Sequence, residues 1–212
     1  MGPEARGLVI FGGTFNPIHL GHLIVAEEVR RRMTAGEQIL FMPAAQPPHK
    51  PPVSVPATHR CAMVKLAIAA NPGFASSDLE IARGGTSWTV DTIRALQARE
   101  PGKKIYLLVG ADSVPDLPGW READTLLRIC QIVVAARPGW DASAIDGLPG
   151  RFDAALVEGL HRHAFPTPRV EISSTEIRRR LAAGESVRYW LPEAVDSYIR
   201  TNRLYGVSQG AP

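Results

Sequence analysis

Two histidines stand just after a glycine-rich turn near the start of the chain. An apolar run from Leu8 to Phe11 leads into Gly12-Gly13 and then to His19 and His22. Residues three apart share one face of a helix, so both imidazoles are expected to reach the same ligand. Glycines let the backbone approach an anion, and the N–H groups at a helix start carry partial positive charge. The spacing therefore predicts a phosphate-binding loop.

Other interpretations of this segment are weaker. No Gly-Lys-Ser/Thr follows the glycines, so the loop is not a Walker A motif, and its spacing is not that of the GxGxxG dinucleotide fingerprint. A zinc site would need a third ligand at suitable spacing from His19 and His22, and the sequence offers none. We expect no metal ion bound directly by protein side chains.

A second cluster of polar residues follows the apolar run at 170–172. Ser173 and Ser174 stand there, and Glu176 three residues after Ser173 completes the pattern of a capping box, which predicts a helix start. Arg178 lies one turn into that helix. Because a guanidinium matches the geometry of a phosphate, we expect Arg178 to meet the phosphates from the side opposite the histidines.

The elements that must hold these residues alternate in type. Apolar, β-branched runs are separated by segments with helical spacing, as at Leu20, Leu23, Ile24 and Val29. Strands alternating with helices predict right-handed crossovers, and hence an α/β fold with a doubly wound parallel sheet. The expected strands are 8–11, 39–42, about 75–81, 105–109, 132–136 and 170–172.

The length of 212 residues suggests a single domain, which we expect to span 7–206. Two helices, 173–183 and 192 to about 202, should form a C-terminal helical appendage covering about 173–206. Residues 1–6 and 207–212 are expected to be flexible tails. The N-terminus lacks an apolar signal and no apolar stretch approaches bilayer length, so we expect a cytoplasmic protein.

The charge and cysteine content limit the possible partners. Lys and Arg number 24 against 21 Asp and Glu, a net charge of +3, which fits phosphate-bearing small molecules at least as well as nucleic acid. Cys61 and Cys130 are isolated within apolar segments, so neither a CxxC redox pair nor a cysteine zinc site can form. Both cysteines are expected to fill core space.

Longer stretches of the chain resemble a known family. The segment GGTFNPIHLGH at 12–22 resembles the signature of the HxGH nucleotidyltransferases, which transfer a nucleotidyl group from a nucleoside triphosphate to a phosphate, and ISSTEIR at 172–178 is similar to their second signature. PPHK at 47–50, RGGTSWTVDT at 83–92, GADS at 110–113 and LPGW at 117–120 resemble bacterial nicotinate-nucleotide adenylyltransferases. The resemblance runs from Leu8 to Gly206 and implies a Rossmann-like fold.

The resemblance also implies a set of site residues. It gives catalytic roles to His19, His22 and Arg178. It implies that ATP is bound by Gly12, Gly13, Thr14, Phe15, His19, His22, Gly110, Asp112, Ser173, Ser174 and Arg178. It implies that the second substrate is bound by Asn16, His49, Lys50, Trp88, Thr89 and Trp120, with aromatic faces for a flat pyridine ring. Mg²⁺ is the implied cofactor, bound mainly through ATP phosphates and water. Asn16 stands where the family more often has Asp, and Trp88 where Tyr is common.

The expected activity is transfer of AMP from ATP to nicotinate mononucleotide, giving deamido-NAD and pyrophosphate in NAD biosynthesis. The expected partners are these two small molecules, with no nucleic acid and no membrane, and a homo-oligomer is left open. One alternative is an adenylyltransferase for another phosphate acceptor, either nicotinamide mononucleotide or phosphopantetheine. Another is a non-catalytic nucleotide-sensing or nucleic-acid-binding domain.

Overall fold

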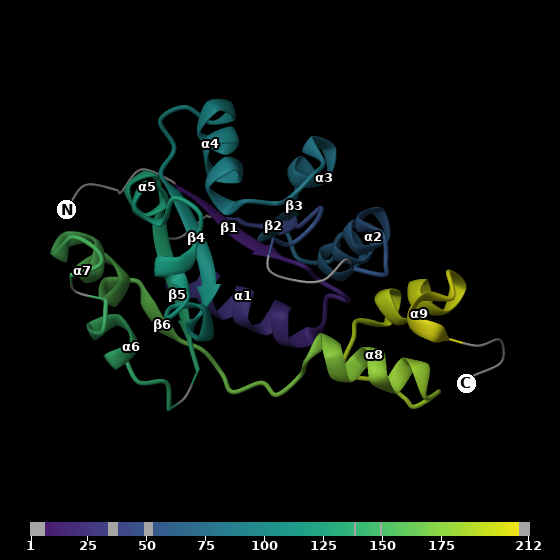
Figure 1. The fold of residues 1–212 in the computed structure, drawn as a ribbon. Coiled ribbons are helices and arrows are strands. Elements are labelled where there is room, and N and C mark those ends of the chain that lie inside the picture. Colours follow the sequence, from purple (N-terminus) through teal and green to yellow (C-terminus); the bar gives the residue numbers. More distant parts are fainter. Residues whose placement is uncertain (1–6, 34–37, 49–52, 138, 149, 208–212) are drawn as a thin grey trace.

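The computed structural model describes residues 7–33, 38–48, 53–137, 139–148 and 150–207. Its centre is a six-stranded sheet in which all neighbouring strands are parallel, in the order β3-β2-β1-β4-β5-β6 (Figure 1). The predicted doubly wound α/β fold is confirmed. The strands are β1 (Leu8–Gly13), β2 (Ile39–Pro43), β3 (Phe74–Ser76), β4 (Ile105–Gly110), β5 (Gln131–Ala136) and β6 (Ala164–Pro166).

Helices cover both faces of this sheet (Figure 1). One face packs against α1 (Leu20–Arg32), α2 (Ala57–Ile68), α8 (Ser174–Ala182) and α9 (Glu193–Thr201). The other face packs against α3 (Leu79–Arg83), α4 (Thr89–Arg99), α5 (Ala123–Ile129), α6 (Ser143–Asp146) and α7 (Ala154–Arg162). Three short 3₁₀ helices are η1 (Ala111–Ser113), η2 (Leu117–Gly119) and η3 (Leu204–Gly206).

The strands are apolar throughout because both faces of the sheet are buried. Side chains alternate between faces along a strand, so Val9 of β1 joins the hydrophobic cluster under α1 while Ile10 joins the cluster under α4. Leu108 and Leu107 of β4 divide in the same way. Cys61 and Cys130 are free thiols and both are buried, Cys130 within the cluster under α4, which confirms their predicted place in the core.

The prediction of a strand over about 75–81 was wrong beyond Ser76. Only Phe74–Ser76 pair with β2, and the chain then turns into the one-turn-and-a-half helix α3. The hydroxyl of Ser77 accepts a hydrogen bond from the Leu79 N–H at 3.2 Å, which starts that turn. Apolar Leu79 and Ile81 therefore stand on a short helix, whose pattern over five residues cannot be told from that of a strand.

The prediction of a last strand at 170–172 was also wrong. The sixth strand is Ala164–Pro166, which pairs with β5 from Val134↔Ala164 to Ala136↔Pro166. This strand has three residues, lies at the sheet edge and ends in proline, so its pattern is too short to detect. Val170 and Ile172 have the β-branched side chains typical of strands, but they line a cavity described below.

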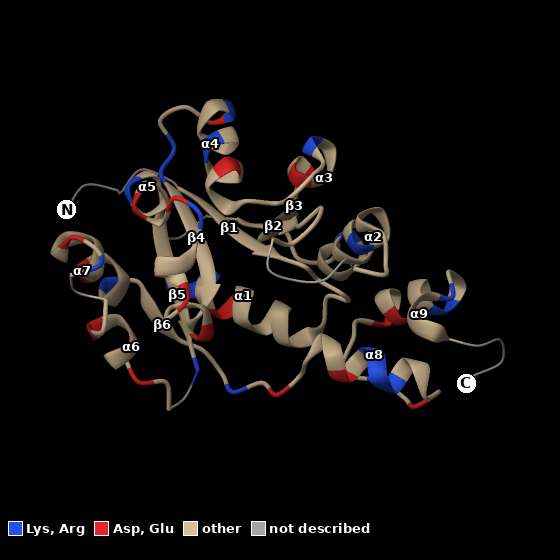
Figure 2. Cartoon of the chain, in the orientation of Figure 1, with Lys and Arg blue, Asp and Glu red and all other residues tan. Residues whose placement is uncertain are grey.

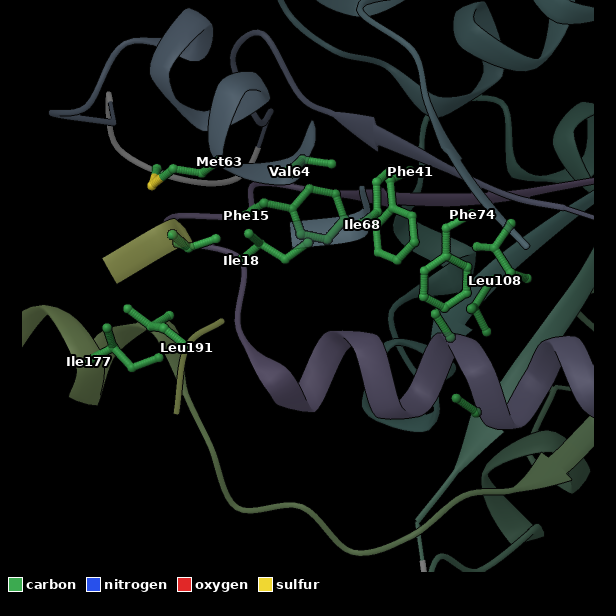
Figure 3. Close-up of a cluster of buried hydrophobic side chains, with 14 of the residues drawn as sticks. Phe15, Ile18, Phe41, Met63, Val64, Ile68, Phe74, Leu108, Ile177 and Leu191 are labelled. Atoms are coloured by element: carbon green, nitrogen blue, oxygen red, sulfur yellow. The ribbon is translucent and has the colours of Figure 1, made fainter. Parts of the chain in front are cut away.

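The C-terminal helices share a hydrophobic core with the sheet. The Ser173 hydroxyl accepts a hydrogen bond from the Glu176 N–H at 3.2 Å, which confirms the predicted start of α8. Pro192 precedes α9 as its N-cap, so the helix itself begins at Glu193. Ile177 and Leu191 belong to the same buried cluster as Phe15 and Met63, as Figure 3 shows. This shared core holds the motif at 172–178 next to the motif at 12–22.

Charged residues lie mainly on the helices and loops, while the strands are almost free of them (Figure 2). Many of these charges pair within their own helix, such as Arg30 with Glu27 and Arg179 with Glu176. Among the described residues, no helix is both long and apolar enough to cross a bilayer.

Candidate active site

The glycine-rich turn at the end of β1 is shaped by Phe15. A Cβ on Gly13 would lie 2.9 Å from the Phe15 ring, so a larger residue does not fit there. Phe15 adopts a positive φ of 47°, and its ring packs edge-on against Phe11 at 5.6 Å and His22 at 5.1 Å. The side chain is 2% exposed. Its ring therefore supports the loop from the core, and only its backbone can contact a ligand.

The two histidines lie against each other at the start of α1. Their ring centroids are 3.7 Å apart and the rings are inclined by 26°. His22 Nδ1 accepts a hydrogen bond from the His19 backbone N–H at 3.2 Å, which assigns the proton of neutral His22 to Nε2. The two imidazole rings therefore lie on the same side of the start of α1, as their spacing predicts.

His19 is the more enclosed of the two histidines. Its side chain is 6% exposed, and burial lowers its pKa from 6.5 to about 4, because the charged form loses its hydration. At pH 7 it is a neutral ring. Its Nδ1 atom is buried and has no hydrogen-bond partner among the described residues. A buried polar atom of this kind is normally paired, so a bound ligand or water is expected there.

The second motif contacts the first through α8. The Arg178 guanidinium donates from Nη1 to the Asn16 carbonyl at 2.8 Å and from Nη2 to the Thr175 hydroxyl at 3.2 Å. The Ser174 hydroxyl donates to the Pro17 carbonyl at 2.9 Å. Arg178 was predicted to face phosphates opposite the histidines. In this structure it binds the loop that carries them, and it is not among the residues lining the two cavities below.

The side chain of Asn16, which is predicted to bind the second substrate, makes a hydrogen bond within the protein. Its Oδ1 accepts a hydrogen bond from the Tyr205 hydroxyl at 2.8 Å, and Asn16 lines neither of the two cavities below. Tyr205 belongs to η3, 189 residues further along the chain, so sequence spacing gave no sign of this contact. His49 and Lys50 lie outside the described residues.

Two cavities adjoin at the carboxyl ends of β1 and β4. The first has a volume of about 380 Å³ and the second about 420 Å³. Both are lined by Phe11 of β1 and by residues 108–110 of β4. The strand order reverses between these two strands, and ligands of doubly wound sheets bind at such a point.

The predicted residues divide between the two cavities. The first cavity is lined by residues that include Gly12, Gly13, Thr14, Trp88, Thr89, Trp120 and Gly110. The second is lined by residues that include His19, His22, Gly110, Asp112, Ser173 and Ser174. The aromatic residues are thus separated from the histidines, while both groups open onto the ends of the same two strands. A Cβ at Gly110 would contact the Asp112 carboxylate, so the two residues lie against each other in the wall of the second cavity.

Several lining residues had no predicted role. Arg137 and Thr167 line the second cavity, and Arg121 lies over the Trp88 ring with its guanidinium carbon 5.3 Å from the centroid. Buried Glu80 lines the first cavity and accepts a hydrogen bond of 2.6 Å from the Thr92 hydroxyl. These are single polar or charged residues in helical or loop segments, and only the fold brings them to the site. Arg137 alone had a sequence signal, since it directly follows the apolar run 132–136.

Comparison with known proteins shows the family of the chain. The cytidylyltransferase-like family model matches residues 10–180. A Synechococcus sp. (strain JA-3-3Ab) protein named "Probable nicotinate-nucleotide adenylyltransferase" is 42% identical over 204 residues, which are 96% of each chain. A Geobacter sulfurreducens protein of the same name is 43% identical over 92% of this chain and 96% of its own.

Solved structures show the same fold. Plasmodium falciparum nicotinic acid mononucleotide adenylyltransferase complexed with NaAD superposes with a TM-score of 0.73 at 18% identity, covering 96% of this chain and 98% of the other. The same protein complexed with APC superposes with a TM-score of 0.72. With near full-length identity above 40% to the bacterial relatives, the chain belongs to the cytidylyltransferase-like family and, within it, to the nicotinate-nucleotide adenylyltransferases.

Proposed function

We propose that this chain transfers AMP from ATP to nicotinate mononucleotide, forming deamido-NAD and pyrophosphate. The observation that carries the proposal is the pair of adjoining cavities at the ends of β1 and β4, one lined by histidines and serines and the other by tryptophans. A reaction that joins two nucleotides needs two sites that meet where the new bond forms. The complex of the Plasmodium falciparum protein with NaAD, which has the same fold, supports this assignment.

The second cavity is the proposed ATP site. His22 presents an Nε2–H donor, and neutral His19 adds the polarity of a second ring at the helix start. Ser173 and Ser174 line the wall contributed by α8, and Arg137 supplies a cation beside them. Arg178 lies behind the lining of this cavity and donates two hydrogen bonds within the protein, from its Nη1 and Nη2 atoms. A guanidinium has five N–H groups, so Arg178 can hold the Asn16 loop and still donate to a phosphate.

The first cavity is the proposed site of the pyridine nucleotide. Trp88 and Trp120 offer flat faces for the ring, and Thr89 is the first residue of α4, whose N-terminal N–H groups favour an anion. Such a donor-rich wall suits the carboxylate of nicotinate. Glu80 adds an acceptor in the same cavity, so the wall is less uniformly donor-rich than Thr89 alone suggests, and Thr92 occupies one of its oxygens.

The chemical step needs no activated side chain. An oxygen of the acceptor 5′-phosphate forms a bond to the α-phosphorus of ATP. The bond from that phosphorus to the oxygen that bridges to the β-phosphate breaks, and pyrophosphate leaves with this oxygen. The acceptor phosphate has a second pKa near ~6, so at neutral pH it is mostly dianionic and attacks without a general base. The protein's contribution is then to position both nucleotides and to stabilise charge on the transferred phosphate.

Mg²⁺ enters the proposal as part of the MgATP substrate. Among the described residues no group of three or more His, Cys, Asp or Glu side chains could hold a metal ion. Magnesium binds through few protein ligands when phosphates and water supply the rest of its shell. In this position it neutralises charge on the triphosphate and on the departing pyrophosphate.

Pyrophosphate release from ATP tests the proposal when three acceptors are compared at saturating Mg²⁺. Nicotinate mononucleotide should give pyrophosphate and an equal amount of deamido-NAD, measured by chromatography. Turnover with nicotinamide mononucleotide or phosphopantetheine in its place would correct the acceptor but keep adenylyl transfer. No pyrophosphate release with any of the three acceptors would overturn the enzyme function and favour a nucleotide-sensing domain.

A further inference from the structure

One arginine is buried behind the first cavity. Arg60 of α2 is 1% exposed, the lowest exposure of any charged side chain in the described parts of the chain. Burial lowers the pKa of its guanidinium. Buried arginines usually pair with a carboxylate, but no Asp or Glu of the described residues forms an ion pair with Arg60. Its hydrogen bonds go to backbone carbonyls instead.

These carbonyls come from three separate loops. Arg60 donates from Nη1 to Thr14 at 2.6 Å, and Thr14 follows the glycine-rich turn after β1. It donates from Nη2 to Ala44 at 2.6 Å and Ala45 at 2.9 Å, in the loop after β2, and from Nε to Val55 at 3.3 Å. Thr14 and Ala44 line the first cavity, whereas Arg60 lines neither cavity.

The same connections continue to the wall that carries the tryptophan. The Ala45 N–H donates to the Ser87 hydroxyl at 2.9 Å, and the Ser87 N–H donates to the Gln46 carbonyl at 2.8 Å. Ser87 is buried and directly precedes Trp88 and Thr89. A planar fork with fixed donor directions can hold several carbonyls in one arrangement, which a single ammonium on a flexible stem cannot do.

We infer that Arg60 is a positioning residue for the acceptor nucleotide. From behind the first cavity it holds the Thr14 loop against the loop at Ala44–Ala45, and through Ser87 it sets the place of Trp88 and Thr89. The inference rests on the proposed function, because it assigns the acceptor to the first cavity. Arg60 touches neither substrate, and its effect passes through the backbone of the cavity wall.

The contact with Thr14 has an electrostatic consequence as well. The Thr14 carbonyl and the Phe15 N–H belong to one peptide unit, so a cation on the carbonyl polarises that N–H toward stronger donation. Among the described residues no backbone carbonyl accepts a hydrogen bond from the Phe15 N–H. The buried charge of Arg60 thus strengthens a donor of the predicted phosphate loop without meeting the ligand.

Kinetics of Arg60→Lys, which keeps the charge but not the fork, test this inference. The KM for nicotinate mononucleotide should rise at least about tenfold, while the KM for ATP changes less than about threefold. Arg60→Met should lower kcat/KM for the acceptor further than Arg60→Lys does. The matched control is Ile68→Ala, which opens a cavity in the same helix at a residue that lines neither substrate cavity. It should lower stability but keep both KM values within about threefold.

Equal effects of Arg60→Lys and Ile68→Ala on the acceptor KM would overturn the inference. If the Arg60 variants do not fold, Ser87→Ala cuts the next connection and should raise the acceptor KM alone, and an unchanged KM would contradict the chain of contacts. If the wild-type protein shows no turnover, the proposed function fails separately. Amide hydrogen exchange then tests the inference without turnover. Arg60→Lys should speed the exchange of the Ala45 and Ser87 amides at least about tenfold and leave that of Val134 unchanged. If the exchange rates of all three amides change by the same factor, the positioning role of Arg60 is wrong.

Discussion

Buried His19 should make the protein less stable as the pH falls. Its pKa is lowered to about 4 in the folded protein, against 6.5 for an exposed histidine. Between pH 6.5 and about pH 4, His19 is protonated in the unfolded chain but neutral in the folded protein. The free energy of unfolding therefore decreases as the pH falls through this range, and it does not change through His19 above the range. From these two values, His19 alone should remove about 2 kcal/mol of unfolding free energy between pH 7 and pH 5.

Replacement by Asn isolates this effect. Asn does not titrate in this range and is a good N-cap residue, which suits the place of His19 before α1. Urea unfolding of both proteins, followed by tryptophan fluorescence at pH 7 and pH 5, measures the difference. The wild type should lose about 2 kcal/mol more than His19→Asn, because all other titrating groups are shared. A difference below about 0.5 kcal/mol would refute the claim that His19 is held neutral by burial.

Four further outcomes follow from the site. His22→Ala should lower kcat by about 10²-fold with a cooperative unfolding transition retained, because it removes a donor at the transferred phosphate, and near-normal turnover would remove that role. Arg178→Ala should lower kcat/KM for ATP similarly, whereas exposed Arg31→Ala should leave it unchanged, and equal effects would argue against a specific contact. Tyr205→Phe should cost about 1 kcal/mol in urea unfolding through its lost bond to Asn16, while an unchanged midpoint would show that the bond contributes nothing. The kcat/KM for nicotinate mononucleotide should exceed that for nicotinamide mononucleotide by about 10² or more, and Trp120→Ala should lower it, whereas equal values for the two nucleotides would refute the donor-rich wall.

Sequence patterns predicted the long helices and the central strands of the sheet. The alternation of apolar strands with helices was enough for the sheet class, because β1, β4 and β5 are buried on both faces and read as continuous apolar runs. The edge strands were not predictable in the same way. β3 and β6 have three residues each, and their pairing depends on the neighbouring strand rather than on their own side chains.

The candidate site shows the same division. The sequence predicted the residues that stand in contiguous motifs, because their spacing along the chain fixes how they lie in a turn or on a helix. These residues are the glycines, both histidines and Ser173, and the structure brings them to the ends of β1 and β4. Arg60 was not predictable, because its partners are carbonyls 5 to 46 residues away and every residue has a carbonyl. The hydrogen bond from Tyr205 to the side chain of Asn16 was not predictable either, because the two residues are 189 positions apart in the chain.

The central claim is that the two cavities bring the α-phosphate of ATP to the phosphate of a pyridine mononucleotide. It is tested most directly by following radioactive phosphorus from ATP labelled either at the α- or at the γ-phosphate, with nicotinate mononucleotide as acceptor. The α-label should appear in deamido-NAD and the γ-label in pyrophosphate, in equal amounts. Label from the γ-phosphate on the mononucleotide, or no transfer of the α-label while both nucleotides bind, would contradict adenylyl transfer at this site.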